Sequence, residues 1–357
     1  MTPFGSTTAT ATATATTAAT VSRAASIDPR DCKVPQVGDD GISSLAWSPT
    51  HNYLASSNWD GGVRLWQVEE QATQVRATPQ AMVRHDGKAP VLDCCFSADG
   101  STLFSGGGDK AVRMWKLASQ PPNWIGQQIG VHDSPVKAVR YLPSSKLVVS
   151  GGWDRKLKFW DQRSSSPVGY LDLPERVYGL DVRGNLMVAI TADRKLFVYD
   201  ASGPQPVLEY EMDSPLRCQS RCVACLPNQK GFAIGGLEGR VCIRHRNNAK
   251  GFRFQCHRQG SDVFAVNAIA FANRYSTFAT CGADGGVSFW NKDLKQKVKE
   301  FKPIQRSISC ATFNTQGNLF AYSSSYDWSK GCGHYAQGSP NEIYVHYTPD
   351  SELKPRK

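Results

Sequence analysis

Short runs of alternating apolar and polar residues recur along the chain from about residue 38. One example is Leu54-Ala-Ser-Ser57, which leads through a Gly/Asp turn into Val63-Arg-Leu-Trp66. Successive side chains of a strand point to opposite faces, so each run predicts a strand with one buried face. Gly and Asp tolerate the backbone angles of the tight turns between strands. The pattern therefore predicts an all-β chain of short antiparallel strands.

The strands and turns form a repeat. Seven acidic turn residues lie 39 to 49 positions apart, and five of them are followed six residues later by an aromatic side chain. This is the WD40 signature, whose usual period is about 40–45 residues. Seven copies predict a seven-bladed WD40 β-propeller. The turn acids are Asp60, Asp109, Asp154, Asp193, Glu238, Asp284 and Asp327, and the aromatic residues are Trp66, Trp115, Trp160, Tyr199 and Trp290.

A ring of blades needs closure, because an open ring would leave two exposed sheet edges. Residues 31–37 are predicted to supply the outermost strand of the last blade, where Pro35 is tolerated because the strand is an edge. Two blades depart from the repeat. Blade 5 has Arg244 in place of its aromatic residue, and blade 7 contains a loop over residues 326–341. A loop of that length in a compact blade is often functional.

The His, Ser and Asp residues of the repeat are interpreted as structural. In two blades they form a candidate brace with the tryptophan, in which a chain of hydrogen bonds satisfies buried polar groups. Because the set recurs as architecture, it does not indicate a serine hydrolase, and no GxxxxGK[ST], HExxH or GxSxG motif is present. We therefore expect no enzymatic activity, cofactor or small-molecule substrate. The two braces are His85, Ser105, Asp109 and Trp115, and His132, Ser150, Asp154 and Trp160.

The cysteines and the two ends of the chain refine this interpretation. Most of the 11 cysteines lie in apolar runs, which is typical of core residues in a reducing compartment. Cys222 and Cys225 have CxxC spacing, but on a strand they would point to opposite faces, so no metal site is expected. Residues 1–27 are rich in Thr and Ala and are predicted to be a disordered tail, although their composition also fits an organellar transit peptide. The propeller is assigned to residues 28–347 and a basic C-terminal tail to residues 348–357.

The net charge of +10 favours an anionic partner, and no apolar run approaches the ~18 residues of a membrane span. The residues after the turn acids are basic in blades 2 to 5, and tryptophans precede the turn acids of blades 1 and 3. The b–c turns of a propeller emerge on one rim, so this arc is predicted to dock an acidic, extended peptide. The predicted residues are Trp59, Lys110, Trp153, Arg155, Lys156, Arg194, Lys195, Arg240, Trp328 and Lys330.

A second basic cluster lies around blade 6. Residues 252–258 interleave phenylalanines with basic side chains, and four lysines follow Trp290 within residues 291–299. Aromatic and basic side chains together suit single-stranded RNA, through stacking and phosphate contacts. Phe252 and Phe254 also alternate like the core face of a strand, so both interpretations stay open.

Several segments, including one outside the repeat, resemble a known family. They are Gly151-Gly-Trp-Asp-Arg-Lys-Leu-Lys-Phe-Trp-Asp161, Glu238-Gly-Arg-Val241, Cys256-His-Arg258, Ser325-Tyr-Asp-Trp-Ser-Lys-Gly331 and Glu352-Leu-Lys-Pro-Arg356. Through them residues 31–357 resemble the RNA export 1 family of WD40 proteins, the mRNA-export factors of the nuclear pore. Phe4-Gly5 fits the FG-bearing tail of that family.

The resemblance implies a non-catalytic scaffold in the nucleus and at the nuclear envelope that shuttles to the cytoplasm. Such a scaffold binds the GLEBS hairpin of an FG nucleoporin and supports poly(A) RNA export, with a further role at the mitotic spindle and checkpoint. It implies that Arg240 meets the acidic residues of that hairpin. It also implies a nucleic-acid groove at Phe254, Trp290, Lys292, Lys295 and Lys297. The chain departs from the family at Asn291, where an acid is usual, and in residues 331–334.

Two other functions remain open. The related mitotic-checkpoint propeller binds GLEBS-like peptides of checkpoint kinases. A substrate receptor of a cullin ubiquitin ligase carries a WDxR box for its adaptor, and Trp160-Asp-Gln-Arg163 fits that box.

Overall fold

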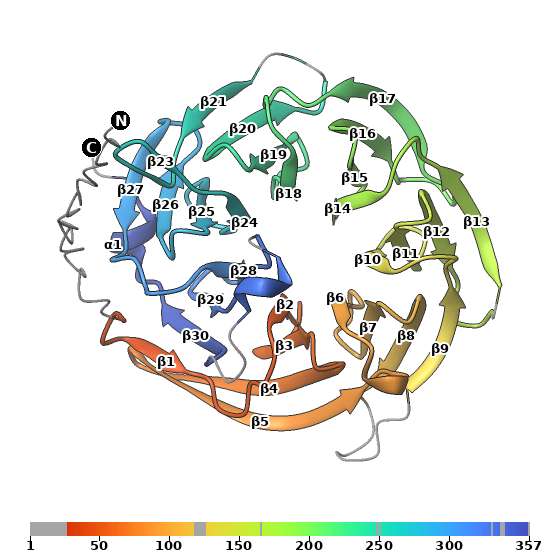
Figure 1. The fold of residues 1–357 in the computed structure, drawn as a ribbon, viewed down its shortest axis with the longest axis horizontal. Coiled ribbons are helices and arrows are strands. Elements are labelled where there is room, and N and C mark those ends of the chain that lie inside the picture. The colour runs from red at the N-terminus through yellow and green to blue at the C-terminus, as the bar shows by residue number, and fades with distance from the viewer. Residues whose placement is uncertain are drawn as a thin grey trace, which may run out of the picture.

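The fold is a ring of seven four-stranded antiparallel sheets (Figure 1). The computed structural model describes residues 27–117, 126–164, 166–247, 249, 251–329, 331–335 and 340–355, and the sheets are counted over these residues. The predicted Phe4-Gly5 feature and the predicted tail up to residue 26 lie outside them. The predicted seven-bladed propeller is confirmed.

In the first six blades the chain runs from the innermost strand to the outermost one, whereas the outermost strand of the last blade is β1. The blades are: β2 (Ile42–Trp47), β3 (Tyr53–Asn58), β4 (Gly62–Gln71) and β5 (Gln74–Arg84); β6 (Val91–Phe96), β7 (Thr102–Gly107), β8 (Ala111–Lys116) and β9 (Gly126–Val131); β10 (Val136–Leu142), β11 (Leu147–Gly152), β12 (Lys156–Trp160) and β13 (Pro167–Asp172); β14 (Val177–Arg183), β15 (Leu186–Thr191), β16 (Lys195–Asp200) and β17 (Val207–Asp213); β18 (Ser220–Cys225), β19 (Gly231–Gly236), β20 (Arg240–His245) and β21 (Phe252–Gln255); β24 (Val266–Phe271), β25 (Thr277–Gly282), β26 (Val287–Asn291) and β27 (Gln296–Glu300); and β28 (Ile308–Phe313), β29 (Leu319–Ser324), β30 (Glu342–Tyr347) and β1 (Asp31–Lys33).

The core lies between adjacent blades. The second strands, such as β7, β15 and β29, are buried along their whole length, because a neighbouring sheet packs on each face. The outermost strands are more exposed, and in β13 exposed and half-buried residues alternate from Val168 to Asp172. The tryptophans of the repeat fill the spaces between sheets, and Trp66 and Trp160 are fully buried. Each such aromatic side chain contributes about 2–3 kcal/mol by leaving water.

The last blade closes the ring with the N-terminal strand. β1 pairs antiparallel with β30, and Cys32 lies opposite Val345. This confirms the predicted closing strand, although the paired segment is shorter than residues 31–37. Pro35 has no N–H to donate to the ladder, so regular pairing ends before it. The backbone carbonyl of Pro35 instead accepts a hydrogen bond from the indole of Trp66 (2.8 Å).

A buried histidine joins the two ends of the chain at this seam. Nδ1 of His346 lies 2.5 Å from Asp31, and its Nε2 lies 2.9 Å from Glu352 on the short helix α1 (Asp350–Leu353). Arg30 donates to the same glutamate (2.7 Å). Leu353 is fully buried, so this part of the segment set apart as a C-terminal tail packs against the propeller.

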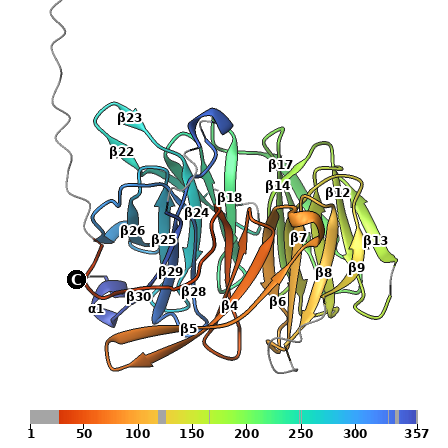
Figure 2. The same cartoon turned by 60° about the horizontal axis from the view of Figure 1, so that its bottom comes forward.

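The first blade also reaches across the seam. The hairpin β4–β5 is about twice as long as its counterparts and extends toward β30 and α1 (Figure 2). Val68 and Ala77 of the hairpin are buried together with Val34 and Val345 of the closing sheet. The hairpin explains why the spacing between the turn acids Asp60 and Asp109 is the longest of the repeat.

The closure histidine makes stability depend on pH. Burial alone would lower the pKa of His346, but hydrogen bonds and charges of Asp31 and Glu352 raise it overall. A raised pKa contributes stability that is complete below the unfolded value of about 6.5 and is lost as the pH rises through the folded value.

We therefore expect His346→Gln to lower the free energy of unfolding by about 3 kcal/mol or more at pH 6, because it leaves the buried carboxylate of Asp31 without a cation. The deficit relative to the wild type should narrow at alkaline pH. Denaturant unfolding at several pH values measures it, with the exposed His245→Gln as the control. A deficit that does not depend on pH would contradict a charged His346.

Candidate functional site

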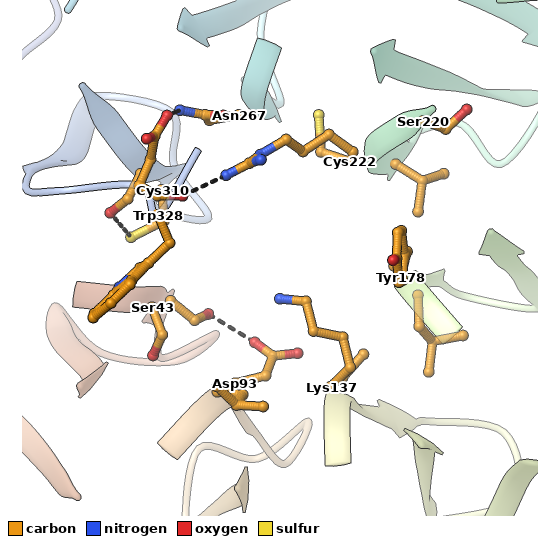
Figure 3. Close-up of a pocket in the computed structure, with 18 of the residues that line it drawn as sticks. Ser43, Asp93, Lys137, Tyr178, Ser220, Cys222, Asn267, Cys310 and Trp328 are labelled. Carbon is orange, nitrogen blue, oxygen red and sulfur yellow. Dashed lines mark hydrogen bonds between the residues drawn. The ribbon is translucent and has the colours of Figure 1, made fainter. Parts of the chain in front are cut away.

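A channel runs through the centre of the ring (Figure 3). Its volume is about 700 Å³, and its walls come from the innermost strands of all seven blades, β2, β6, β10, β14, β18, β24 and β28. Residues of the b–c turns, among them Trp59, Trp153 and Trp328, line one mouth. The channel is therefore a concave site to which every blade contributes.

Carboxylates tie adjacent blades together inside the channel. Asp93 of blade 2 accepts hydrogen bonds from Ser44 of blade 1 (2.7 Å) and from Arg140 of blade 3 (2.5 Å). Arg140 also donates to Asp181 of blade 4 (3.3 Å), which accepts a bond from the backbone N–H of Cys225 in blade 5 (2.6 Å). These bonds hold five innermost strands in a fixed arrangement, so the wall of the site is rigid.

Aromatic side chains gather at the mouth. The rings of Trp59 and Trp328 lie 4.7 Å apart, and Trp328 stacks on Tyr335 with centroids 5.1 Å apart. Trp153 lines the same mouth and is 40% exposed. The structure thus brings together all three tryptophans that the sequence predicted for the peptide site.

The position after the turn acid adopts a left-handed backbone in all seven blades, and Trp328 occupies it in blade 7 (φ 59°). Glycines fill it in blades 1, 5 and 6, whereas Lys110, Arg155 and Arg194 occupy it in blades 2, 3 and 4, with φ between 64° and 69°. A left-handed conformation costs a residue with a Cβ about 1–2 kcal/mol. All three basic side chains are exposed. Three successive blades therefore carry an exposed cation where glycine would be less strained.

The other predicted basic residues of the rim are ion-paired, half-buried or outside the described residues. Lys156 binds Asp172 (2.6 Å) on the outermost strand of its blade, and Lys195 lies 3.5 Å from Glu211. Arg240 is half-buried, and its Nε is buried without a hydrogen-bond partner. Lys330 lies outside the described residues. The rim thus divides into three exposed cations, two ion-paired lysines and one half-buried arginine, and their roles in binding stay predictions.

The wall of the channel carries basic side chains that the spacing of the b–c turns did not predict. Lys137, Arg140 and Arg221 lie on innermost strands and line the wall. Strand alternation marks such positions only as polar, and nothing in one repeat shows that seven innermost strands converge. Their grouping was therefore not predicted.

Most of the predicted nucleic-acid groove also comes together. The rings of Phe254 and Trp290 lie 4.6 Å apart, with the ammonium of Lys297 5.2 Å from the indole. Lys295 lies 5.1 Å from the ring of Phe252. Lys292 instead pairs with its neighbour Asp293. A cavity of about 540 Å³ borders this cluster and adds Gln255, Arg258 and Lys302, which the sequence analysis did not assign to the groove.

The structure confirms both predicted braces and shows a third. Ser105 bonds His85 (2.8 Å) and Trp115 (2.9 Å), and Ser150 bonds His132 and Trp160 (both 2.6 Å). In blade 6, Thr280 takes the place of the serine between His257 (3.0 Å) and Trp290 (2.9 Å). It was missed because Thr replaces Ser and because His257 adjoins the basic segment.

Each brace ends on a turn acid. Asp284 accepts from Nδ1 of His257 (2.9 Å), and its pKa is lowered because that bond and the backbone N–H of Gly286 outweigh its burial. One chain of hydrogen bonds thus runs from the indole N–H through the threonine hydroxyl and the imidazole to the carboxylate. The braces therefore fix the b–c turns that form the rim.

Cysteines give no metal site in the part of the chain that is described. Cys222 lines the channel, whereas Cys225 packs on the other side of β18 with Leu186 and Val188, as the alternation predicted. Over the described residues no group of three or more His, Cys, Asp or Glu side chains is arranged to hold a metal ion. No helix among them is long and apolar enough to cross a bilayer.

Comparison with known proteins agrees with this architecture. The family described as "WD domain, G-beta repeat" matches residues 32–67, 78–116, 126–161 and 250–291. The chain is 39% identical over 348 residues to the "Poly(A)+ RNA export protein" of Schizosaccharomyces pombe, covering 95% of this chain and 96% of the relative. It is 42% identical over 347 residues to the "mRNA export factor" of Xenopus tropicalis (92% and 91%). It is 38% identical over 321 residues to "Protein RAE1" of Arabidopsis thaliana (88% and 90%).

The third brace should stabilise blade 6 through its hydroxyl group. Thr280→Val keeps the shape of the side chain but leaves the indole of Trp290 and Nε2 of His257 without a partner. We expect the free energy of unfolding to fall by about 1–3 kcal/mol in a denaturant titration. The exposed Thr315→Val should change it by less than about 0.5 kcal/mol. Equal effects of the two substitutions would contradict the brace.

Proposed function

Because this chain belongs to the family of poly(A)+ RNA export proteins and mRNA export factors, we propose that it is an mRNA export factor that works by binding. It is a non-catalytic scaffold that serves nucleocytoplasmic transport in the nucleus and at the nuclear pore. Its partner is an FG nucleoporin, held through the acidic, extended GLEBS hairpin. The mitotic spindle and checkpoint role belongs to the same proposal.

The observation that carries this proposal is the set of exposed cations at strained turn positions. Lys110, Arg155 and Arg194 accept a left-handed backbone that glycine adopts in blades 1, 5 and 6. Backbone strain that persists on a rigid scaffold is typical of functional positions. The three side chains follow one arc of the rim over successive blades, so they match a ligand that is extended and negatively charged.

Three tryptophans provide apolar contacts for the proposed peptide beside the basic arc. Trp59, Trp153 and Trp328 surround the mouth beside this arc and offer large, rigid surfaces to apolar parts of the peptide. Aromatic anchors of this kind usually contribute most of the affinity, whereas rim charges mainly speed association and select the partner. The proposed peptide therefore crosses the mouth and lies along the basic arc.

A direct contact with single-stranded RNA is supported by the cluster between blades 5 and 6. The rings of Phe254 and Trp290 lie 4.6 Å apart with their planes tilted by 48°, and Lys297 lies over the indole of Trp290. Lys295 lies over the ring of Phe252 beside them. Base stacking on aromatic side chains contributes about 1–3 kcal/mol per base, and the lysines suit the phosphates. In this proposal the groove on the side of the ring binds RNA while the mouth holds the nucleoporin.

The other two partner classes have weaker support. Arg163 of the WDxR segment is hydrogen bonded to Asp161 (2.6 Å and 2.9 Å), a contact that is local to its own turn. A checkpoint kinase would use the same mouth as the nucleoporin. Affinity purification distinguishes the classes by whether nucleoporins, checkpoint kinases or a ligase adaptor predominate.

Reversing the charge of two arginines in the basic arc should weaken binding of the nucleoporin. We expect Arg155→Glu with Arg194→Glu to weaken retention of the GLEBS-bearing nucleoporin at least tenfold in a pull-down treated with RNase, because like charges then oppose the peptide. Lys146→Glu with Lys230→Glu makes the same change of charge at exposed turns between first and second strands, at the opposite ends of their blades. Retention that is equal in both double variants would refute the arc as the docking surface.

Reversing the charge of two lysines in blade 6 should weaken RNA binding and leave nucleoporin binding unchanged. Lys295→Glu with Lys297→Glu should lower the affinity for single-stranded poly(A) RNA and flatten its salt dependence. Two lost phosphate contacts correspond to a decrease of about 1.4 in the slope of log K against log salt. Fluorescence anisotropy over a salt series measures this, and the Arg155/Arg194 variant is the control. An unchanged slope would mean that these lysines do not bind RNA.

A further inference from the structure

We propose that the central channel is a receptor for one acidic side chain of the bound peptide, and that Lys137 binds its carboxylate. The inference rests on the proposed function and adds the residue that anchors the peptide below the rim. It concerns the wall of the channel, whereas the arc and the tryptophans lie around its mouth.

Lys137 lies on β10, and its ammonium group projects into the open centre of the channel (Figure 3). It forms no hydrogen bond or ion pair with any residue that the structure describes. Burial lowers its pKa, and the charges of Arg221 and Arg140 add to this effect against the opposing charge of Asp93. Lys137 is half-buried, and a partly desolvated cation without a carboxylate partner is unfavourable. An incoming carboxylate would offset that cost.

The carboxylates that line the channel with Lys137 are already engaged. Asp93 accepts bonds from Ser44, from the backbone N–H of Val139 (2.9 Å) and from Arg140. Asp327, on the far wall, accepts a bond from Asn267 (3.0 Å). The internal acids therefore belong to the bonds that tie the blades together, and Lys137 is left for a ligand.

Two further polar atoms at the site have no partner. The indole N–H of Trp328 is buried and unpaired, and so is the side-chain oxygen Oδ1 of Asn267. Both residues line the same channel as Lys137. A peptide backbone offers one acceptor and one donor per residue, which is the pair that these atoms lack. The three unpaired groups together suit an acidic residue within an extended chain.

The charge balance of the channel favours a single carboxylate. Its cations Lys137, Arg140 and Arg221 are offset by Asp93, Asp181 and Asp327. A polyphosphate would bring several negative charges to a channel whose described lining has one cation without a hydrogen bond, because Arg221 already donates to the backbone carbonyl of Asp327 (2.8 Å). The internal acids would repel the excess charge. A lone Asp or Glu side chain instead pairs with Lys137 and leaves the other contacts intact.

A pair formed inside the channel differs from one on the rim in its response to salt. Exposed charges are screened within about 10 Å at 0.1 M salt, whereas partly buried pairs are screened much less. The contribution of Lys137 to affinity should therefore persist at ionic strengths that abolish the contributions of Arg155 and Arg194.

A double-mutant cycle tests this inference. The full chain is titrated calorimetrically with a GLEBS segment of an FG nucleoporin, and with the same segment carrying one Glu→Gln or Asp→Asn change at a time. Lys137→Met should weaken binding at least tenfold at both low and high salt. One acid-to-amide change should weaken wild-type binding by a similar factor and have little further effect on the Lys137→Met protein.

Matched variants complete the design. Lys137→Arg, which keeps the charge, should retain most of the affinity, and the exposed Lys230→Met should bind like the wild type. Thermal unfolding verifies that each variant is folded. Binding by Lys137→Met that equals the wild type, or effects that are additive for every acid, would overturn the inference and leave the proposed function standing. Failure of the wild type to bind the segment would overturn both.

Discussion

The structure depends on ring closure through the last blade. Its sheet combines β1 from the start of the chain with β28, β29 and β30 from its end. Without β1, the edge of β30 and the first blade would face solvent, and the strands around the channel would lose their fixed positions. His346 secures this sheet because its two nitrogens meet carboxylates from both ends of the chain. The geometry of the mouth is therefore a consequence of closure.

The repeated braces position the turn residues that form the rim of this ring. Each brace joins a buried tryptophan to the acid of the adjacent b–c turn, so packing between sheets determines the positions of the turn residues. The blades that carry full braces, 2, 3 and 6, have well-defined turns, and two of them present Lys110 and Arg155. Blade 7 instead uses a loop whose Trp328 packs on Trp59 of blade 1 across the seam. The same rim therefore combines b–c turns that are fixed by braces with a blade 7 loop that departs from the repeat.

The sequence predicted the fold and the tryptophans of the mouth because both follow from local spacing. Turn acids, aromatic residues and alternation repeat within each blade, so one copy predicts the next. The channel cations were not predicted, since Lys137, Arg140 and Arg221 lie far apart along the chain and meet only when the ring closes. The ion pairs of Lys156 and Lys195 were missed for a similar reason, because the register of an outermost strand decides which acid faces which lysine. The third brace was not predicted because Thr280 stands at the position that serine occupies in the other two braces.

The pairing of β1 with β30 also constrains how the molecule is made. Asp31 lies opposite His346, so more than 300 residues separate the partners of this sheet. During synthesis the first strand leaves the ribosome long before its partner exists, and contacts of such sequence separation form slowly. Until the final blade has been translated, the growing propeller displays unpaired strand edges of the kind that chaperones protect from aggregation. The same pairing that makes the finished ring rigid therefore makes its biogenesis depend on β30, which is synthesised more than 300 residues after β1.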